Sequence, residues 1–265
     1  MKRLISILLL VSAFRLDAAL TLIDQGFTAG TGSAVATLSM SPNTAMVVGD
    51  TGIVLLTWTN SGSGGSTKIF TQATFTDPKG NVWTRQLDAI YHPGAANSGV
   101  EIAAYTTPIT TQIGVTDSIT VTASTATTSR IGYLYEARGL NGPPTFVAAA
   151  AACDGCTTGQ TSTTPGVTSS SITTGDAIVA WNGQKDNGAV TGSSDTTNGT
   201  WSPVGTVNAS TSFRISLQSK IVTGTGTIPW FISIANSVAW NSAWIQLREA
   251  LVTQSATNGF MILAK

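Results

Sequence analysis

Charged residues are scarce in this chain. Only 10% of its 265 residues are Asp, Glu, Lys or Arg, and 13 basic residues balance 13 acidic ones, whereas soluble domains average about 25% charged residues. A chain without net charge offers no electrostatic attraction to nucleic acid or to an acidic membrane surface, so neither partner is expected. Disordered chains combine low hydrophobicity with high charge, and the 42% hydrophobic content therefore indicates a folded protein.

Residues that commonly carry catalysis are scarce as well. The chain has one histidine, His92, which stands in a His-Pro-Gly turn, and no Gly-x-Ser-x-Gly nucleophile elbow accompanies it. The glutamates are Glu101, Glu136 and Glu249, and a glycosidase needs two carboxylates that face each other across a bond. We predict no catalytic residue, no cofactor and a protein that is not an enzyme; an extracellular hydrolase is the last alternative.

Metal ligands do not gather in the sequence either. Asp50, Asp77, Asp117 and Asp176 stand at turns and could in principle bind calcium. No dense Asp-x-Asp-x-Asp loop is present, however, and aspartate commonly caps turns by bonding to its own backbone. We therefore predict turn-forming roles for these residues and no metal site.

The two cysteines lie close together in Cys153-Asp-Gly-Cys156. Such a pair can be redox-active, form half of a zinc site or close a small disulfide. A redox pair normally opens a helix after a strand, which is not indicated here, and a zinc site needs four ligands. We predict a Cys153–Cys156 disulfide that fixes the loop between two repeats, as an oxidising compartment would allow.

The N-terminus has the pattern of an export signal. Lys2 and Arg3 precede an apolar stretch at residues 4–14, and Ala18 and Ala19 provide small residues for cleavage. The apolar stretch is shorter than the roughly 20 residues that cross a bilayer. The sequence therefore predicts a signal peptide at residues 1–19, no membrane span and a secreted or cell-surface location; a first strand that is retained is the alternative.

Extended segments dominate the rest of the chain. Apolar and other residues alternate along 100–104, 119–123 and 213–217, which is typical of strands with one buried face. The continuous apolar run at 46–58 favours a strand buried on both faces. Further strands are expected at residues 20–24, 34–39, 70–75 and 82–90. The alanine run at 148–152 is either the first strand of a second repeat or part of a linker.

A long internal repeat organises these strands. Three pairs of residues are each separated by 113 positions, and two further pairs occur upstream at larger separations. Ordered landmarks of this kind indicate a duplication. The three pairs are Ile102 with Ile215, Ile119 with Ile232, and Glu136 with Glu249; the two upstream pairs are Trp83 with Trp201, and Asp50 with Asp176.

Seven or eight strands per copy, with turns every ~8–12 residues, favour an antiparallel sandwich. The predicted fold is all-β, with two tandem antiparallel β-sandwiches, jelly-roll or immunoglobulin-like, that arose by internal duplication; one large pseudo-symmetric sandwich is the alternative. The expected organisation is a signal peptide at 1–19, a first sandwich at 20–141, a linker or first strand at 142–165, a second sandwich at 166–250 and a C-terminal extension strand at 251–265.

The chain resembles a group of uncharacterised exported bacterial proteins over about residues 20–250. The resemblance rests on the Gly49-Asp50 strand start, on the Thr-Asp-x-x-Gly-Asn-x-Trp-Thr pattern at 76–84 and on the Glu-Ala-x-Gly-Leu close at 136–140. These motifs describe turns and strands, so the resemblance implies fold and export and carries no catalytic residue. It is also similar to modules of phage tail and fibre proteins.

These observations favour a non-catalytic, extracellular structural or adhesive surface protein. The apolar segment at 251–265 could complete the sheet edge of a neighbour, so the expected partner is a second copy of the chain, in a fibre or filament assembled by strand exchange. The seven tryptophans are expected in the core, but an exposed one could stack on sugars. The alternatives are a carbohydrate-binding module that recognises surface glycans, a phage tail or fibre protein, and the hydrolase.

Overall fold

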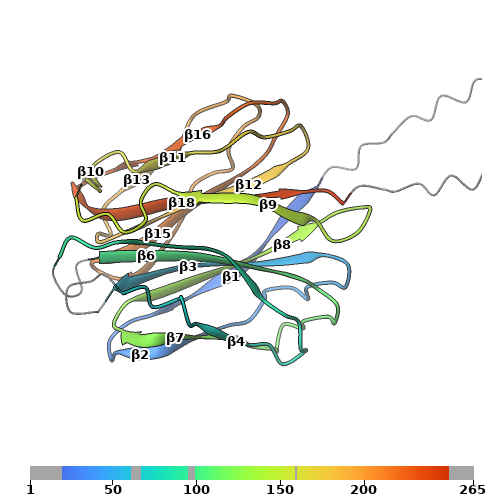
Figure 1. Cartoon of the computed structure of the whole chain (residues 1–265), viewed down its shortest axis with the longest axis horizontal. Helices are drawn as coiled ribbons and strands as arrows, with labels where there is room; N and C mark the ends of the chain where they lie inside the picture. Colours follow the sequence, from blue (N-terminus) through green and yellow to red (C-terminus); the bar gives the residue numbers. More distant parts are fainter. Residues whose placement is uncertain (1–19, 61–66, 95–98, 159, 251–265) are drawn as a thin grey trace, which may run out of the picture.

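The protein is a stack of four β-layers (Figure 1). The computed structural model describes residues 20–60, 67–94, 99–158 and 160–250, and all regular structure in these ranges is β-strand. The predicted all-β class with antiparallel sheets is confirmed. The predicted signal peptide at 1–19 and extension at 251–265 lie outside the described residues.

The first half of the chain, residues 20–141, forms a large and a small sheet. The large sheet has the order β1-β8-β3-β6-β5, and the small sheet has the order β2-β7-β4. The strands are β1 (Thr21–Gly30), β2 (Val35–Met40), β3 (Thr51–Asn60), β4 (Thr74–Thr76), β5 (Thr84–Tyr91), β6 (Gly99–Pro108), β7 (Ile119–Thr127) and β8 (Arg130–Arg138).

The second half, residues 142–250, repeats this arrangement in a more broken form. Its large sheet has the order β14-β15-β12-β18, with β9 and β10 both paired to β18, and the pairs β11-β16 and β13-β17 form the outer layer. The strands are β9 (Thr145–Ala151), β10 (Thr161–Ser162), β11 (Gly166–Thr168), β12 (Ala177–Gln184), β13 (Val190–Thr191), β14 (Gly205–Ser210), β15 (Phe213–Ile221), β16 (Pro229–Phe231), β17 (Ser233–Ile234) and β18 (Val238–Arg248).

The strand order of the first half favours a jelly roll over an immunoglobulin-like sandwich. Strands β1, β3, β6 and β8 lie in one sheet, while β2, β4 and β7 lie in the other. This alternation between facing sheets is the arrangement that two interlocked Greek keys produce. Only β5 departs from it, because it pairs with β6 at the edge of the large sheet.

Three hydrophobic cores hold the four layers together. Each half has its own core between its large and small sheets. The third core lies between the two large sheets, where Leu55 of β3 and Trp181 of β12 contribute from opposite sides. Because each large sheet is covered on both faces, its central strands are buried throughout, as β12 is from Ala177 to Gln184.

One prediction about β6 is wrong. The alternation at residues 100–104 predicted a strand with one exposed face, but β6 is buried from Gly99 to Thr107. The apolar face with Ile102 packs in the core between the two large sheets, and the face that the pattern assigned to solvent, with Ala103, packs in the first half's own core. By contrast, the expectation that the run at 46–58 holds a strand buried on both faces is confirmed for β3, from Thr51 onward.

The first predicted repeat pair, Ile102 with Ile215, occupies matching places in the two large sheets. Ile102 lies opposite Thr57 in the first large sheet, and Ile215 lies opposite Gly183 at the matching place in the second. Ile119 and Ile232 are both buried in the outer cores. The halves therefore share a sheet order, and duplication remains our explanation for it.

The third pair, Glu136 with Glu249, is wrong. Ala137 pairs with Thr51 at the start of β3, and Leu247 pairs with Ala177 at the start of β12. The position that matches Glu136 is therefore Gln246, three residues before Glu249. The constant separation of 113 residues ends before the last strand, because Gln246 follows Ile232 more closely along the chain than Glu136 follows Ile119.

Two strand boundaries differ from expectation, and one open assignment is decided. The predicted strand at 70–75 is reduced to Thr74–Thr76, because the amides of Ile69 and Phe70 donate to the Glu101 carboxylate instead of to a neighbouring strand. Strand β1 continues past the expected glycine turn through a bulge at Gly26, whose φ is 96°. The alanine run at 148–152 forms most of β9, so the strand interpretation was correct.

Candidate functional site

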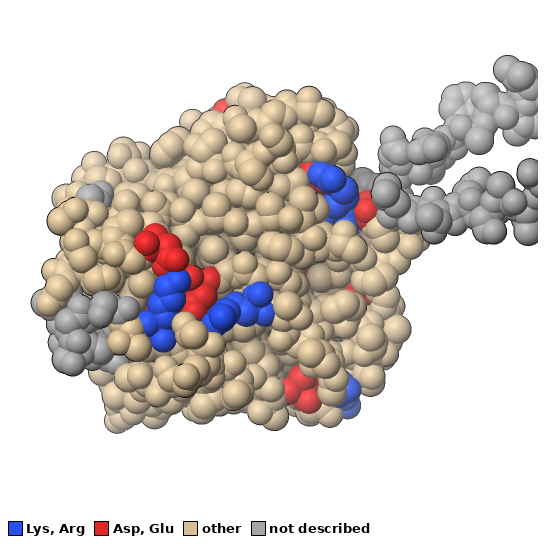
Figure 2. Space-filling model, viewed as in Figure 1, with Lys and Arg blue, Asp and Glu red and all other residues tan. Residues whose placement is uncertain are grey.

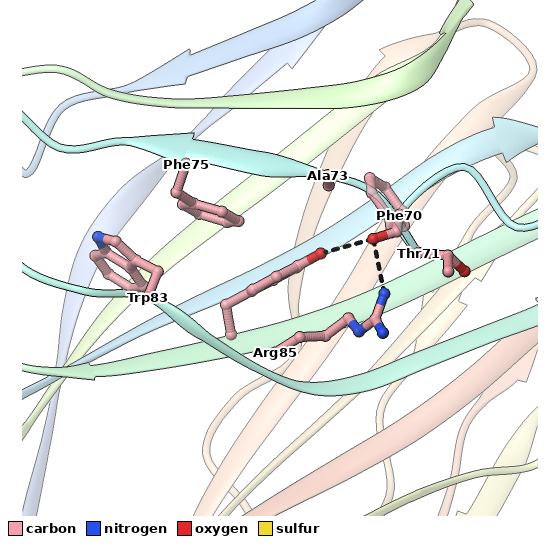
Figure 3. Close-up of a pocket in the computed structure, with 7 residues that line it drawn as sticks. Phe70, Thr71, Ala73, Phe75, Trp83 and Arg85 are labelled. Carbon is pink, nitrogen blue, oxygen red and sulfur yellow. Dashed lines mark hydrogen bonds between the residues drawn. The ribbon is translucent and has the colours of Figure 1, made fainter.

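A small pocket opens at one side of the first half, over the exposed flank of its large sheet. Its volume is about 220 Å³, and its lining comes from the segment before β4, from β4 itself, and from the adjoining parts of β5 and β6. Figure 3 shows aromatic rings at one end of the pocket and a guanidinium group at the other. The lining residues are Phe70, Thr71, Ala73, Phe75, Trp83, Arg85 and Tyr105.

The aromatic wall of the pocket is held in a fixed geometry. The rings of Phe75 and Trp83 stack with centroids 5.6 Å apart, and the ring of Tyr105 lies 4.4 Å from that of Phe75. The Trp83 indole N–H donates to Asp77 Oδ2 over 3.1 Å. Trp83 is half-buried, so part of its indole remains accessible beside the pocket.

The polar wall converges on one carbonyl oxygen. Arg85 Nη1 and the Tyr105 hydroxyl both donate to the carbonyl of Phe70, over 2.9 and 3.2 Å (Figure 3). Burial raises the pKa of Tyr105 above its ordinary value, so this side chain remains a neutral hydrogen-bond donor. The arrangement fixes Arg85 at the rim, where its side chain is 38% exposed.

Two carboxyl groups lie behind the pocket. Glu101 is fully buried and accepts the amides of Ile69 and Phe70 at 2.7 and 3.0 Å. Burial and the nearby negative charge of Asp88 raise the pKa of Glu101 to about 8. Asp88 accepts hydrogen bonds from Arg85 and from the Thr71 hydroxyl. Neither carboxyl group lines the pocket, although a hydrolytic pair must reach its substrate.

The predicted Cys153–Cys156 disulfide is present. Its turn closes over the outer edge of β5: the Gly155 amide donates to the carbonyl of Ile90 over 2.8 Å, and the His92 amide donates to the carbonyl of Cys156 over 3.0 Å. Asp154 forms an ion pair with Lys68 at 2.7 Å. The loop between the halves is thus fixed, as predicted, to the end of β5 in the first half and, through Ala152 and Cys153, to β18 in the second.

The charged groups on the face shown in Figure 2 are few, and most gather in one group in which the two signs alternate. Ion pairs of this kind join Lys68 to Asp154 and Arg85 to Asp88. Because each cation has an acidic partner, the region next to the pocket offers no strong field of either sign.

A second type of charged cluster recurs in both halves at the start of the central strand. Asp50 pairs with Arg138 at 2.8 Å, and Asp176 pairs with Arg248 at 2.7 Å. Burial raises the pKa of Glu136, and the nearby Asp50 carboxyl group raises it further. Glu136 contacts Arg138 within its own half, whereas Glu249 accepts the amide of Asn141.

The tryptophans divide into core residues and one pocket residue. Six are buried, as the core interpretation predicts, and only Trp83 is half-buried. The sequence reasoning did not single out Phe75, Arg85 or Tyr105. The one available signal is the turn pattern at 76–84, which contains Trp83 and predicts a structural turn. The six buried residues are Trp58, Trp181, Trp201, Trp230, Trp240 and Trp244.

Among the described residues, no three His, Cys, Asp or Glu side chains come together as metal ligands would. The same ranges contain no helix with the length and apolar character needed to cross a bilayer.

Comparisons of the chain with protein-family models, with curated proteins and with solved structures found no match.

Proposed function

We propose that this chain is an exported, non-catalytic structural or adhesive protein of the cell surface. The observation that carries the proposal is how the buried acids are used. Glu101, Glu136 and Asp176 are fully buried, and each is held by backbone amides or by side chains of its own half. Acids that are committed to the framework in this way stabilise layers and leave the outer surface poor in charge.

The layered architecture suits a load-bearing subunit. Two large sheets share a core, and each has a further apolar core on its other face. The ends of the described chain, Leu20 and Ala250, lie at the same end of the stack (Figure 1). A segment that leaves from this end can reach the corresponding end of a second copy, which is the geometry that strand exchange between copies requires.

Electron microscopy of purified residues 20–265 tests this proposal. We expect ordered fibres or filaments from this protein. A variant that ends at residue 250 should lose assembly while its unfolding transition stays unchanged. A variant with a Gly/Ser segment of equal length in place of 251–265 separates strand donation from chain length. Assembly that survives both changes, or a protein that stays monomeric throughout, would refute polymerisation by this segment.

A further inference from the structure

The place that holds the pocket in the first half is filled in the second half. Gln218 lies opposite Ala180 of β12, as Tyr105 lies opposite Val54 of β3. Gln218 accepts the Trp230 indole N–H over 3.0 Å and also contacts the backbone of Ser193. Lys220 covers the ring of Trp201, with its ammonium nitrogen 4.9 Å from the ring centroid.

The first half lacks this cover. The position that matches Lys220 is Thr107, because the two residues lie opposite Gly52 and Ile178 in corresponding strands. Threonine is too short to reach across an indole ring. Trp83, the counterpart of Trp201, therefore remains half-buried and lines the pocket. The two halves share a framework, but only the first keeps an aromatic surface open to a ligand.

Donors stand beside this aromatic surface. A guanidinium carries five N–H groups, and Arg85 uses Nη1 for its contacts with Phe70 and Asp88. The Arg85 side chain is 38% exposed, so its remaining N–H groups can donate to a ligand at the rim. The hydroxyl of Thr71 donates to Asp88, and its oxygen can still accept a hydrogen bond.

We propose that this pocket binds a single pyranose ring of a glycan. The C–H face of such a ring packs against the electron-rich face of an aromatic side chain, here Trp83 and Phe75. Its hydroxyl groups bond to Arg85 and Thr71. Few polar groups beside an aromatic wall are typical of small-ligand sites, and about 220 Å³ suits one ring rather than a long oligosaccharide. The inference rests on the adhesive part of the proposed function and gives that part a ligand.

A glycan array carrying neutral and uronic-acid pyranosides, followed by titration calorimetry with the best ligand, tests the proposal. Trp83→Ala removes the aromatic wall, and Ala73→Phe fills the pocket without removing a contact of the framework. We expect each variant to weaken binding at least about tenfold. Phe27→Ala serves as the matched control, because Phe27 is an exposed aromatic residue that does not line the pocket; its affinity should stay within about twofold of the parent.

The outcomes separate this inference from the proposed assembly. Binding of neutral and acidic rings alike, lost in both pocket variants, supports recognition of the ring itself. The proposal is overturned if no pyranoside binds at about 10 mM, if binding survives Ala73→Phe, or if it requires a carboxylate and survives Trp83→Ala. If filaments form but no sugar binds, only the pocket proposal is refuted. If a monomeric protein binds sugar, only the assembly proposal is refuted.

Discussion

The two halves of this protein share one sheet order but differ in the polar residues that lie between the sheets. At the pocket, Tyr105 and Thr107 of the first half correspond to Gln218 and Lys220 of the second. The first pair leaves a pocket open, and the second pair closes it with hydrogen bonds and a cation over a ring. The strand order of the large sheets is the same in both halves although buried residues differ in polarity at matching places, as Trp58 of β3 and Gln184 of β12 do.

The same contrast appears behind the pocket. Glu101 lies opposite Trp58, and the matching residue of the second half is Arg214, opposite Gln184. The first half therefore buries an acid where the second half places a base. Arg214 reaches Asn208 near the surface, whereas Glu101 is fully enclosed. This difference gives the first half a titrating group that the second half does not have at that place.

The largest expected effect concerns the pH dependence of stability. Because folding raises the pKa of Glu101 from 4.5 to about 8, its contribution is greatest below pH 4.5 and declines as the pH rises to 8. Glu101→Gln imitates the protonated acid and should remove a decline on the order of 4 kcal/mol between pH 5 and 8. Denaturant unfolding of the parent and of Glu101→Gln at each pH measures the decline in the free energy of unfolding.

Arg214→Gln is the matched control for that experiment, because arginine does not titrate between pH 5 and 8. Its unfolding free energy should change by a constant amount across the range. If parent and Glu101→Gln show the same slope, the buried carboxyl group of the first half does not retain its proton in the folded protein.

A smaller difference is expected at the two aspartate–arginine clusters. Asp176 accepts bonds from Thr173, Gln246 and Arg248, whereas Asp50 shares Arg138 with a second acid, Glu136. Asp176→Asn should cost about 3 kcal/mol, and Asp50→Asn about 1 kcal/mol, because removing Asp50 also relieves its repulsion with Glu136. Thermal and denaturant unfolding of both variants measures the difference; equal losses would contradict it.

A loss of stability smaller than that of Asp176→Asn is expected at the disulfide. A loop this short removes little entropy from the unfolded chain, so replacing both cysteines by serine should cost about 2 kcal/mol. Hydrogen exchange of the Gly155 and His92 amides should quicken, because these amides bond across the turn to β5. Exchange in β14, the matching edge strand of the second half, provides the reference. Unchanged exchange at Gly155 and His92 would show that the turn holds its place without the bond.

The sequence was sufficient for the class of fold and for most strands, since alternation and long apolar runs reflect local burial. It failed where burial comes from distant segments. Residues 100–104 look half-exposed in the sequence because nothing in their own pattern shows that the face with Glu101 and Ala103 is covered by other segments of the first half. Glu249 was matched to Glu136 because a short motif repeated, whereas the register of the strands selects Gln246.

The candidate site was predictable only in part. The disulfide followed from the spacing of two cysteines in one turn. The pocket depends on Phe75, Trp83, Arg85 and Tyr105, which lie in three different segments. No spacing in the sequence predicts that these segments come together. Its openness depends further on Thr107, a residue whose importance is visible only beside Lys220.

The core between the two large sheets has a consequence for how the chain can be divided. A break in the connection between Arg138 and Thr145 would give two fragments, each with one sheet face of bare apolar side chains such as Leu55 or Trp181. Each fragment alone would tend to aggregate in water, and each would find its best partner in the other. Produced together as separate chains, the fragments should reunite into one particle, and produced singly they should precipitate.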